Sequence, residues 1–519
     1  MTEPAPYRPL TYLAAHAARR PDAPAIYEDG ATISFAEFFD RVRGAMRALE
    51  ELGVQRGEVV GVSLPNAWEY VALEIAIPAL GAVTLPLAPS LGSYELFSVL
   101  SRSSAAVAVT DEQALDGLRD VAKSAPGVRL VVDVGQVAAV GRCSTAAIEP
   151  YPTQPEEIVQ IALTSGTTGP PKLAALSAEL KQLTFEGFTS RLGIVPDDRV
   201  LPLSPISQGV GEMCLYSLRV GACLVMTSER RFSADLGLRV ARESRATVIG
   251  GVPTMIGRMF RDEQFDPAAL ALARVTAVAG APMPPDLAEN WERLTGSRLC
   301  AFYGAMDIGQ LAVASPDDPP EKRWHTVGRP HARAEAMICD SDGRSLGPGK
   351  VGEICMRGPL VQKRYWNEEN GPFAEDGWAH FGDVGFIDDD GFVHVVGRTK
   401  DIIIRGGENI NPYEVEAVLL EHRDVAEVCL VGLADSDLGE RIAACVVVRP
   451  EHELTLESLR EFLAERGLAH YKWVERLLVV EELPLGSSGK VARNELRERA
   501  ASAFADAPLN SGGECALHR

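Results

Sequence analysis

The sequence predicts an α/β protein whose sheets are largely parallel, followed by a β-rich segment and a compact α+β unit. Two observations lead to this fold class. Short strand-like runs alternate with helical patterns from about residue 25 to residue 278. These runs are predominantly apolar, which is typical of parallel strands whose two faces are both covered by helices.

Each predicted strand of this first part is a short apolar run that ends at a turn residue. The run at 59–64 stops at Pro65 and Asn66, a helical pattern continues to about Leu80, and the next strand covers 81–86. Further strands are predicted at 25–27, 107–110, 130–133, 158–163, 200–203, 223–226, 248–250 and 275–278.

The pattern changes after about Glu335. Short strands and Gly-rich turns follow, as at 349–357 and 391–396. From Asp401 onward the predicted order is helix 412–421, strand 425–431, strand 443–448, helix 456–466 and strand 476–480. We therefore expect an N-terminal domain over residues 1–399 and a C-terminal domain over 400–503. Residues 504–519 are small, lack periodicity and are predicted to be disordered.

Composition narrows the classes of function. A chain of 519 residues is long enough for roughly three to four domain-sized units. Its net charge of −21 argues against nucleic acid or an anionic membrane surface as a partner. The nine cysteines include no Cys-x-x-Cys pair and lie mostly in apolar runs, which favours free thiols in a reducing cytoplasm.

No targeting or membrane segment is expected. Residues 1–20 lack the apolar core of a signal peptide. The longest uncharged apolar run, 75–93, is interrupted by Pro78, Gly81, Pro86 and Pro89, so it is predicted to be helix, turn and strand instead of a membrane span.

A Gly-, Ser- and Thr-rich segment over residues 163–172 stands out as a phosphate-binding loop. Glycines allow backbone N–H groups to turn toward a polyanion, hydroxyls add donors, and a lysine adds a point charge suited to phosphate. The order differs from a P-loop because Lys172 follows two prolines and precedes no Ser or Thr. The alternative interpretation is a flexible linker. The residues proposed to hold phosphate are Thr164, Ser165, Gly166, Thr167, Thr168, Gly169 and Lys172.

Five further motifs follow this loop in a fixed order: Tyr303-Gly-Ala-Met-Asp307, Gly382-Asp383, Gly397-Arg-Thr-Lys-Asp401, Gly406-Gly-Glu-Asn-Ile410 and Gly489-Lys490. Together they resemble the signatures of the adenylate-forming superfamily, and most closely those of AMP-forming acyl-CoA synthetases. The resemblance extends from about residue 10 to about residue 500. It implies two mostly parallel α/β sheets, a small β-barrel subdomain at about 335–397, and a mobile C-terminal domain.

The resemblance also implies an activity. An enzyme of this kind uses ATP and Mg²⁺ to convert a carboxylic acid to acyl-AMP, releases pyrophosphate, and transfers the acyl group to coenzyme A. The nucleotide would contact Gly280, Ala281, Pro282, Tyr303, Gly304, Asp383 and Arg398 in addition to the loop. Lys490, Lys172 and Thr168 would be catalytic, and Asp307 and Thr168 would bind Mg²⁺. Asp307 stands where the family usually carries a Glu.

Most of these residues would be unremarkable in isolation. Asp383, Arg398 and Lys490 alone would each be interpreted as surface charges, and Tyr303 as a core tyrosine at a strand end. By resemblance, Lys400 occupies a hinge, and Gly406 and Gly407 would approach the pantetheine arm of coenzyme A. The two glycines could equally form a plain turn.

The acid would occupy a pocket lined by small residues. By analogy with the family, the residues are Ser207, Gln208, Gly209, Gly251, Val252, Ala279, Ala305 and Met306. Small side chains leave room and few charges face the acid, so a bulky, mostly apolar acid is predicted. The alternative is that small residues here only meet packing needs.

The sequence also departs from the family pattern. Ser177-Ala178 replaces a Thr-His pair, and residues 201–208 contain no aromatic or histidine gate. No histidine occurs between His16 and His325, which argues against Ser-His hydrolysis. These departures leave open a stand-alone adenylating enzyme that delivers acyl-AMP to a carrier protein or a second ligase. A catalytically silent homologue and a luciferase-type oxidation are further alternatives, and an oligomer is possible.

Overall fold

The fold is that of a computed structural model, which describes residues 7–143, 148–164, 172–207, 209–227, 229, 231–306, 308–340, 342–368, 371, 377–406, 408–435, 437–486, 490–504 and 516–518. Two compact units are present. The first comprises residues 1–336, 355–380 and 391–393, and the second comprises 337–354, 381–390 and 394–519.

The first unit contains a nine-stranded sheet. Its order is β15 (Arg329–Pro330), β14 (Gly309–Val313), β13 (Arg298–Ala305), β12 (Val275–Val278), β11 (Val248–Gly251), β9 (Arg199–Pro202), β10 (Cys223–Met226), β1 (Pro24–Glu28) and β2 (Ala31–Ser34). The six central strands, from β13 to β1, are parallel, and antiparallel pairs occur only toward the two edges of this described sheet. The prediction of largely parallel sheets is confirmed here.

A second, six-stranded sheet also belongs to the first unit. Its order is β6 (Leu130–Asp133), β5 (Ala105–Thr110), β3 (Val59–Ser63), β4 (Val83–Pro86), β7 (Ile158–Thr164) and β8 (Lys172–Ser177). All pairs are parallel except the β7–β8 hairpin. The strands predicted in this region therefore exist, and each lies within one or two residues of its expected position.

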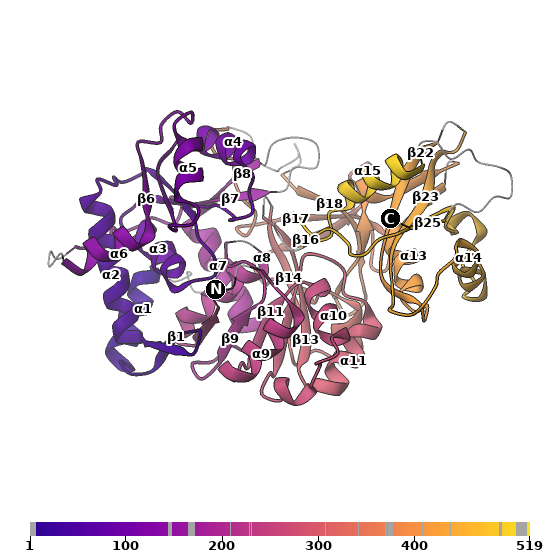
Figure 1. The fold of residues 1–519 in the computed structure, drawn as a ribbon, viewed down its shortest axis with the longest axis horizontal. Helices are drawn as coiled ribbons and strands as arrows, with labels where there is room; N and C mark the ends of the chain where they lie inside the picture. Colours follow the sequence, from indigo (N-terminus) through magenta and orange to yellow (C-terminus); the bar gives the residue numbers. More distant parts are fainter. Residues whose placement is uncertain are drawn as a thin grey trace. The chain divides into compact units, whose positions relative to one another are not determined.

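Helices cover these sheets in the manner that apolar strands require (Figure 1). In the indigo and purple part of the chain, helix α2 packs against both α3 and α6. The helices of this unit are α1 (Pro9–Arg19), α2 (Phe35–Glu51), α3 (Trp68–Ala79), α4 (Ser93–Ser103), α5 (Leu115–Ala122), α6 (Val134–Cys143), α7 (Ala178–Arg191), α8 (Gly209–Leu215), α9 (Ala234–Ser244), α10 (Pro253–Arg261), α11 (Pro285–Thr295) and α12 (Pro320–His325).

Local sequence explains where several of these helices begin. Ser34 and Glu37 form a reciprocal capping box at the start of α2. Ser233 accepts a hydrogen bond from the Leu236 N–H at the start of α9. Each hydroxyl satisfies a backbone donor that would otherwise have no partner within the helix.

The short strands predicted after Glu335 form a four-stranded sheet. Its order is β16 (Glu335–Cys339), β17 (Gly352–Arg357), β18 (Ala379–Ile387) and β19 (Val393–Arg398). The compact units are interleaved in sequence over residues 337–393, so their limits differ from the predicted division at residue 399. The domain limits drawn from the sequence stay a prediction.

The rest of the second unit is an α+β fold. Its sheet has the order β21 (Glu408–Ile410), β20 (Ile403–Arg405), β23 (Gly439–Val448), β24 (Arg476–Val479) and β25 (Ala516–His518), and β22 (Val425–Asp435) also pairs with β23. The sheet packs against α13 (Pro412–Leu419), α14 (Leu456–Glu465) and α15 (Arg493–Phe504) through an apolar core.

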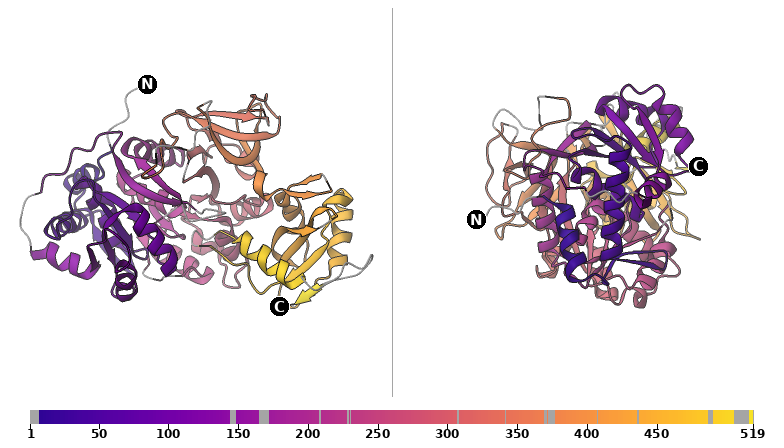
Figure 2. Two further views of the ribbon diagram at one scale, coloured as in Figure 1. Left: turned by 90° about the horizontal axis from the view of Figure 1, so that it is seen from above. Right: turned by 90° about the vertical axis from the view of Figure 1, so that its left-hand side faces the viewer.

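Three residues of the C-terminal tail are described. Ala516–His518 form β25, a parallel edge strand beside β24 (Figure 2), and the expected disorder of residues 504–519 stays a prediction. An edge strand such as β24 offers unpaired backbone groups that another segment can satisfy. A three-residue strand has too little alternation to be recognised in a sequence.

Two expectations from composition can be compared with the described residues. Seven cysteines in them are free and buried, namely Cys214, Cys223, Cys300, Cys339, Cys355, Cys429 and Cys445, as predicted from the apolar runs. Within the same ranges, no helix combines the length and the apolar character needed to cross a bilayer.

Candidate functional site

The carboxyl ends of four parallel strands bring several predicted site residues to one edge of the nine-stranded sheet. In register, Gly250 of β11 lies opposite Pro202 of β9, Gly251 opposite Val278 of β12, and Val278 opposite Ala301 of β13. Residues 203–207, 252 and 279–282, which follow β9, β11 and β12, and residues 303–306 at the end of β13 therefore lie at this same edge. Ligands of open α/β sheets bind at such an edge. Predicted adenine-binding and acyl-pocket residues thus share one location.

Asn66 fixes one of these segments and was not identified from the sequence. Its Nδ2 donates to the Ser204 carbonyl at 3.1 Å, and its Oδ1 accepts from the Ile206 N–H at 2.9 Å. Asn66 follows β3 of the six-stranded sheet, so this side chain ties the carboxyl ends of the two sheets together. The Pro65-Asn66 turn at the strand end was the available signal.

The acyl-pocket residues on these segments are small and largely buried. Gly251 and Val252 are buried, and Ala279 is half-buried. Ser207 is also buried, and its hydroxyl has no hydrogen-bond partner among the described residues. Gly209 begins α8, and Ala305 and Met306 are half-buried. Gln208 lies outside the described residues.

At two positions near the predicted adenine site, the backbone geometry requires glycine. Gly280 has φ of +93°, which L side chains rarely adopt, while its neighbours Ala281 and Pro282 are exposed. A Cβ on Gly304 would lie 2.5 Å from the Gly309 carbonyl oxygen, where β13 and β14 form an irregular hairpin. Tyr303 precedes it and is half-buried. Asp307, the predicted magnesium ligand, lies outside the described residues.

The predicted phosphate loop is the turn of the β7–β8 hairpin. Thr164 ends β7 and pairs with Lys172 at the start of β8. The five loop residues Ser165, Gly166, Thr167, Thr168 and Gly169 lie outside the described residues. The hairpin therefore places Lys172 at the mouth of the loop.

Tyr365 orients Lys172 and was also missed by sequence reasoning. Lys172 Nζ donates to the Tyr365 hydroxyl at 3.2 Å and lies 4.8 Å from the ring centroid. Tyr365 is buried and forms a backbone bridge with Ala174. Ser177, which stands where the family has Thr, caps α7 by accepting from the Leu180 N–H. That departure thus has a structural role.

A second group of predicted residues lies in the second unit. Arg398 Nε donates to Asp383 Oδ1 at 2.7 Å, and Asp383 is buried while Arg398 is partly exposed. Desolvation opposes the charge of Arg398, but Asp383, Tyr413 and Asp401 together raise its pKa. The pair presents a fixed cation and a fixed anion beside each other.

Lys490 lies near this pair. Its loop is closed by a bridge between Leu485 and Val491 and by a hydrogen bond from the Gly486 N–H to the Lys490 carbonyl. Desolvation and the nearby cations Arg398 and Lys400 lower the pKa of Lys490, while Asp383 opposes that shift. Lys490, which is exposed, therefore lies within electrostatic reach of Arg398 and Asp383, although the three residues are distant in sequence.

The predicted hinge and acceptor residues lie close to this group in sequence. Lys400 is exposed and lies in the short 3-10 turn Thr399–Asp401 that follows β19. Gly406 has φ of +58° in the turn between β20 and β21, and Gly407 lies outside the described residues. Neither role is tested by this geometry, so both stay predictions.

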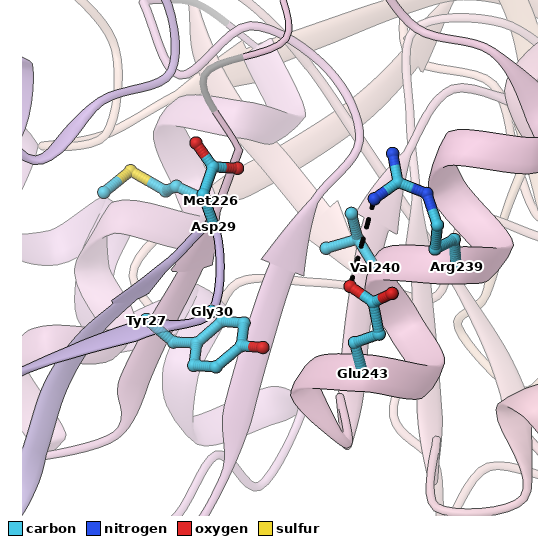
Figure 3. Close-up of a pocket in the computed structure, with 7 residues that line it drawn as sticks. All are labelled: Tyr27, Asp29, Gly30, Met226, Arg239, Val240 and Glu243. Atoms are coloured by element: carbon cyan, nitrogen blue, oxygen red, sulfur yellow. Dashed lines mark ion pairs between the residues drawn. The ribbon is translucent and has the colours of Figure 1, made fainter.

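A pocket of about 190 Å³ lies elsewhere in the first unit (Figure 3). Tyr27, Asp29, Gly30 and Met226 line one side, and Arg239, Val240 and Glu243 of α9 line the other, with Arg239 and Glu243 paired at 3.9 Å. None of the predicted site residues belongs to this lining. The pocket is therefore separate from the candidate site.

The comparisons with known proteins define the class as an adenylate-forming enzyme. Two family models match the chain: "AMP-binding enzyme" over residues 13–366 and "AMP-binding enzyme C-terminal domain" over 414–490. The chain belongs to this family, and it is an enzyme of the acid–CoA ligase class.

Individual proteins support the assignment. The chain is 29% identical to a medium-chain fatty-acid–CoA ligase of Escherichia coli (strain K12), covering 86% of this chain and 82% of that protein. It is 31% identical to a salicylyl-CoA synthase / salicylate adenylyltransferase of Streptomyces sp, covering 95% and 93%. Its fold matches ATP-bound MatB from Rhodopseudomonas palustris with a TM-score of 0.87 and 26% identity, covering 97% and 99%.

Proposed function

We propose that this enzyme activates a bulky, mostly apolar carboxylic acid with ATP and then transfers the acyl group to coenzyme A. The first half-reaction forms acyl-AMP and releases pyrophosphate, and the second forms the thioester. The observation that carries the proposal is the Asp383–Arg398 pair, with Lys490 within its electrostatic reach. A carboxylate acceptor and two cations in one place suit a ribose, an α-phosphate and a substrate carboxylate.

The chemistry requires two anions to meet. The substrate carboxylate must attack the α-phosphorus in line, and the charge that develops on the phosphate oxygens must be neutralised. We assign Lys490 to the carboxylate and α-phosphate, Arg398 and Asp383 to the ribose and phosphate, and Lys172 with the hairpin loop to the triphosphate. Tyr303 and residues 280–282 would hold adenine at the sheet edge.

Magnesium would be held by Asp307 and Thr168. Carboxylate and hydroxyl oxygens are hard ligands of the kind that Mg²⁺ requires, and aspartate retains this chemistry in place of glutamate. When bound, the ion would neutralise triphosphate charge. Both residues lie outside the described ranges, so the proposal rests on the chemistry of the donor set.

The lining of the sheet edge supports this substrate class. Gly251, Val252 and Ala279 are small and carry no charge, and Ser207 adds one buried hydroxyl. Such a lining suits an apolar body with one polar substituent. Related enzymes named for aromatic acids and for a medium-chain fatty acid agree with this breadth. Free, buried cysteines fit a reducing cytoplasm as the location.

A second acceptor is retained as the alternative. The name of one relative, salicylyl-CoA synthase / salicylate adenylyltransferase, contains both activities. The acyl-AMP formed by the present chain would then pass to a carrier protein or a separate ligase.

The test is mass spectrometry of the purified protein with Mg-ATP, coenzyme A and a panel of acids. The panel contains salicylate, 4-coumarate, a medium-chain fatty acid and a polycyclic acid. Acyl-CoA formed from one acid class supports the proposal. Acyl-AMP that accumulates without thioester supports the alternative, and the absence of both products with every acid refutes adenylate formation from this substrate class.

A further inference from the structure

Several charged side chains form hydrogen bonds beside the turn between β20 and β21. β20 and β21 have three residues each, and the described ladder pairs β20 with β23 at a single position, Arg405 with Gly439. Strands this short contribute little stability of their own. Gly406 at the turn has positive φ, and its N–H donates to the Leu438 carbonyl at 2.7 Å.

A closed set of contacts connects Arg405 to Gly406 through the neighbouring strands. Arg405 binds Glu475 with two hydrogen bonds of 2.9 and 3.0 Å. Glu475 also accepts from Arg441 Nη1 at 2.7 Å, and Arg441 Nε donates to Asp435 at 2.5 Å. We call Arg405, Glu475, Arg441 and Asp435 the arginine–carboxylate ring.

Asp435 closes the ring at the other end. Its Oδ1 accepts from the Leu438 N–H at 2.9 Å, and Leu438 in turn accepts from Gly406. A second brace runs from the Ile404 N–H to Glu440 Oε2 at 2.8 Å. β20 is therefore tied to Glu440 and Glu475 by hydrogen bonds to charged groups, which are stronger than neutral ones. Gly406 is tied to Leu438, between β22 and β23, by a backbone hydrogen bond.

The ring is partly shielded from water. The side chains of Glu475 and Asp435 are each 13% exposed, and those of Arg405 and Arg441 are 21% and 20% exposed. Partial burial opposes the charge of Glu475, but the bonds from Arg405 and the Ile442 N–H lower its pKa. The bond from Arg441, with the Leu438 N–H, lowers the pKa of Asp435 to about 2. All four groups therefore stay charged at neutral pH.

We infer that this ring is a positioning device that fixes the Gly406 turn for the thiol-bearing acceptor in the second half-reaction, with Glu475 and Arg441 as positioning residues. The inference rests on the proposed function. A flexible pantetheine arm loses conformational freedom when it binds, and a wall that is already ordered reduces the further cost of assembling the site. The exposed Ile404, at 55%, adds an apolar surface beside the turn.

The test separates the two half-reactions in the Glu475→Gln variant. ATP–pyrophosphate exchange reports adenylation without coenzyme A, and mass spectrometry reports acyl-CoA formation, both with the panel acid that gives the fastest exchange. We expect exchange to stay near the wild-type rate and acyl-CoA formation to fall by about 10- to 100-fold, since misplacement of a binding wall has effects of this size. The Arg441→Gln variant should show the same split.

Glu495→Gln is the matched control. It removes a carboxylate from an exposed pair with Arg499 on α15, in the same unit and outside the ring. Amide hydrogen exchange supplies a readout that needs no substrate: the Gly406 and Leu438 amides should exchange faster in Glu475→Gln and at the wild-type rate in Glu495→Gln.

The outcomes are distinct. Equal losses in both half-reactions would show a general structural role and overturn the inference. Unchanged acyl-CoA formation in both ring variants would overturn it while leaving the proposed function intact. If the wild-type enzyme forms acyl-AMP with no thioester, the proposed acceptor is wrong and the inference falls with it.

Discussion

A buried ion cluster in the first unit gives a sharp prediction about stability. Lys181 of α7 is 2% exposed and donates to Glu74 of α3 at 2.6 Å, with Glu212 of α8 at 3.4 Å. One oxygen of each carboxylate has no hydrogen-bond partner among the described residues. Burial raises the pKa of Glu74, with Glu212 adding to and Lys181 opposing the shift. One cation therefore serves two buried acids.

Replacing Lys181 by methionine keeps the apolar length of the side chain and removes its charge. Breaking a buried pair from one side costs about 3–5 kcal/mol, because the remaining charge stays buried without compensation. Two acids share this lysine, so we expect the upper part of that range. Total stabilities of proteins are about 5–15 kcal/mol, so the loss is large.

The assay is urea unfolding followed by tryptophan fluorescence. With m of about 3 kcal/mol per M, a loss of about 4.5 kcal/mol lowers the midpoint by about 1.5 M. The loss should be greater at pH 8 than at pH 5.5. A raised carboxyl pKa means that the folded state binds more protons than the unfolded state, so stability falls as pH rises.

A surface control and a triple variant test whether the uncompensated buried charge causes the loss of stability. Lys123→Met removes an exposed lysine paired with Asp120 and should leave the urea midpoint close to that of the wild type. Neutralising both acids in the Lys181→Met background, with Glu74→Gln and Glu212→Gln, should restore most of the stability. A shift below about 1 kcal/mol for Lys181→Met, or no recovery in the triple variant, would refute an uncompensated buried charge as the cause.

Three other perturbations follow from the site and its surroundings. Tyr365→Phe removes the hydroxyl beside Lys172 and should raise the KM for ATP about fivefold, for a bond worth about 1 kcal/mol; an unchanged KM in pyrophosphate exchange would contradict this. Asn66→Ala frees the segment 204–206 and should raise the KM for the acid more than that for ATP, which steady-state kinetics with the best panel acid can decide. Burial of Glu28, aided by Glu69, raises the pKa of Glu28 to about 7. Between pH 4.5 and about 7 the Glu28 carboxyl therefore keeps its proton in the folded state and loses it in the unfolded state, so wild-type stability should fall over this window relative to Glu28→Gln. An equal difference in melting temperature between the two proteins at pH 5 and at pH 8 would contradict this expectation.

Most of the fold could be predicted because its strands carry strong local signals. The runs at β3, β10 and β12 are predominantly apolar and bounded by turn residues, so burial on both faces of a parallel sheet was the expected outcome. The interleaved units over 337–393 and the strand β25 were not predicted. Their existence depends on which edge a short segment meets, and a few residues do not encode that partner.

The candidate site was predicted where a motif itself supplies the chemistry. Asp383, Arg398 and Lys490 were recognised by their motifs, and the structure places Lys490 within electrostatic reach of the other two. Asn66 and Tyr365 were missed because an isolated Asn or Tyr carries no motif, and each acts on a segment more than a hundred residues away.

The sequence by itself determined the strand and helix order, the glycine and lysine chemistry of the loop, and the family signatures, because these depend on neighbouring residues and their spacing. Tertiary structure decided which residues meet. The edge shared by β9, β11, β12 and β13 and the pairing of Lys181 with two acids both arise from contacts between distant segments. Such contacts are set by packing of whole elements, where no single stretch of sequence holds both partners.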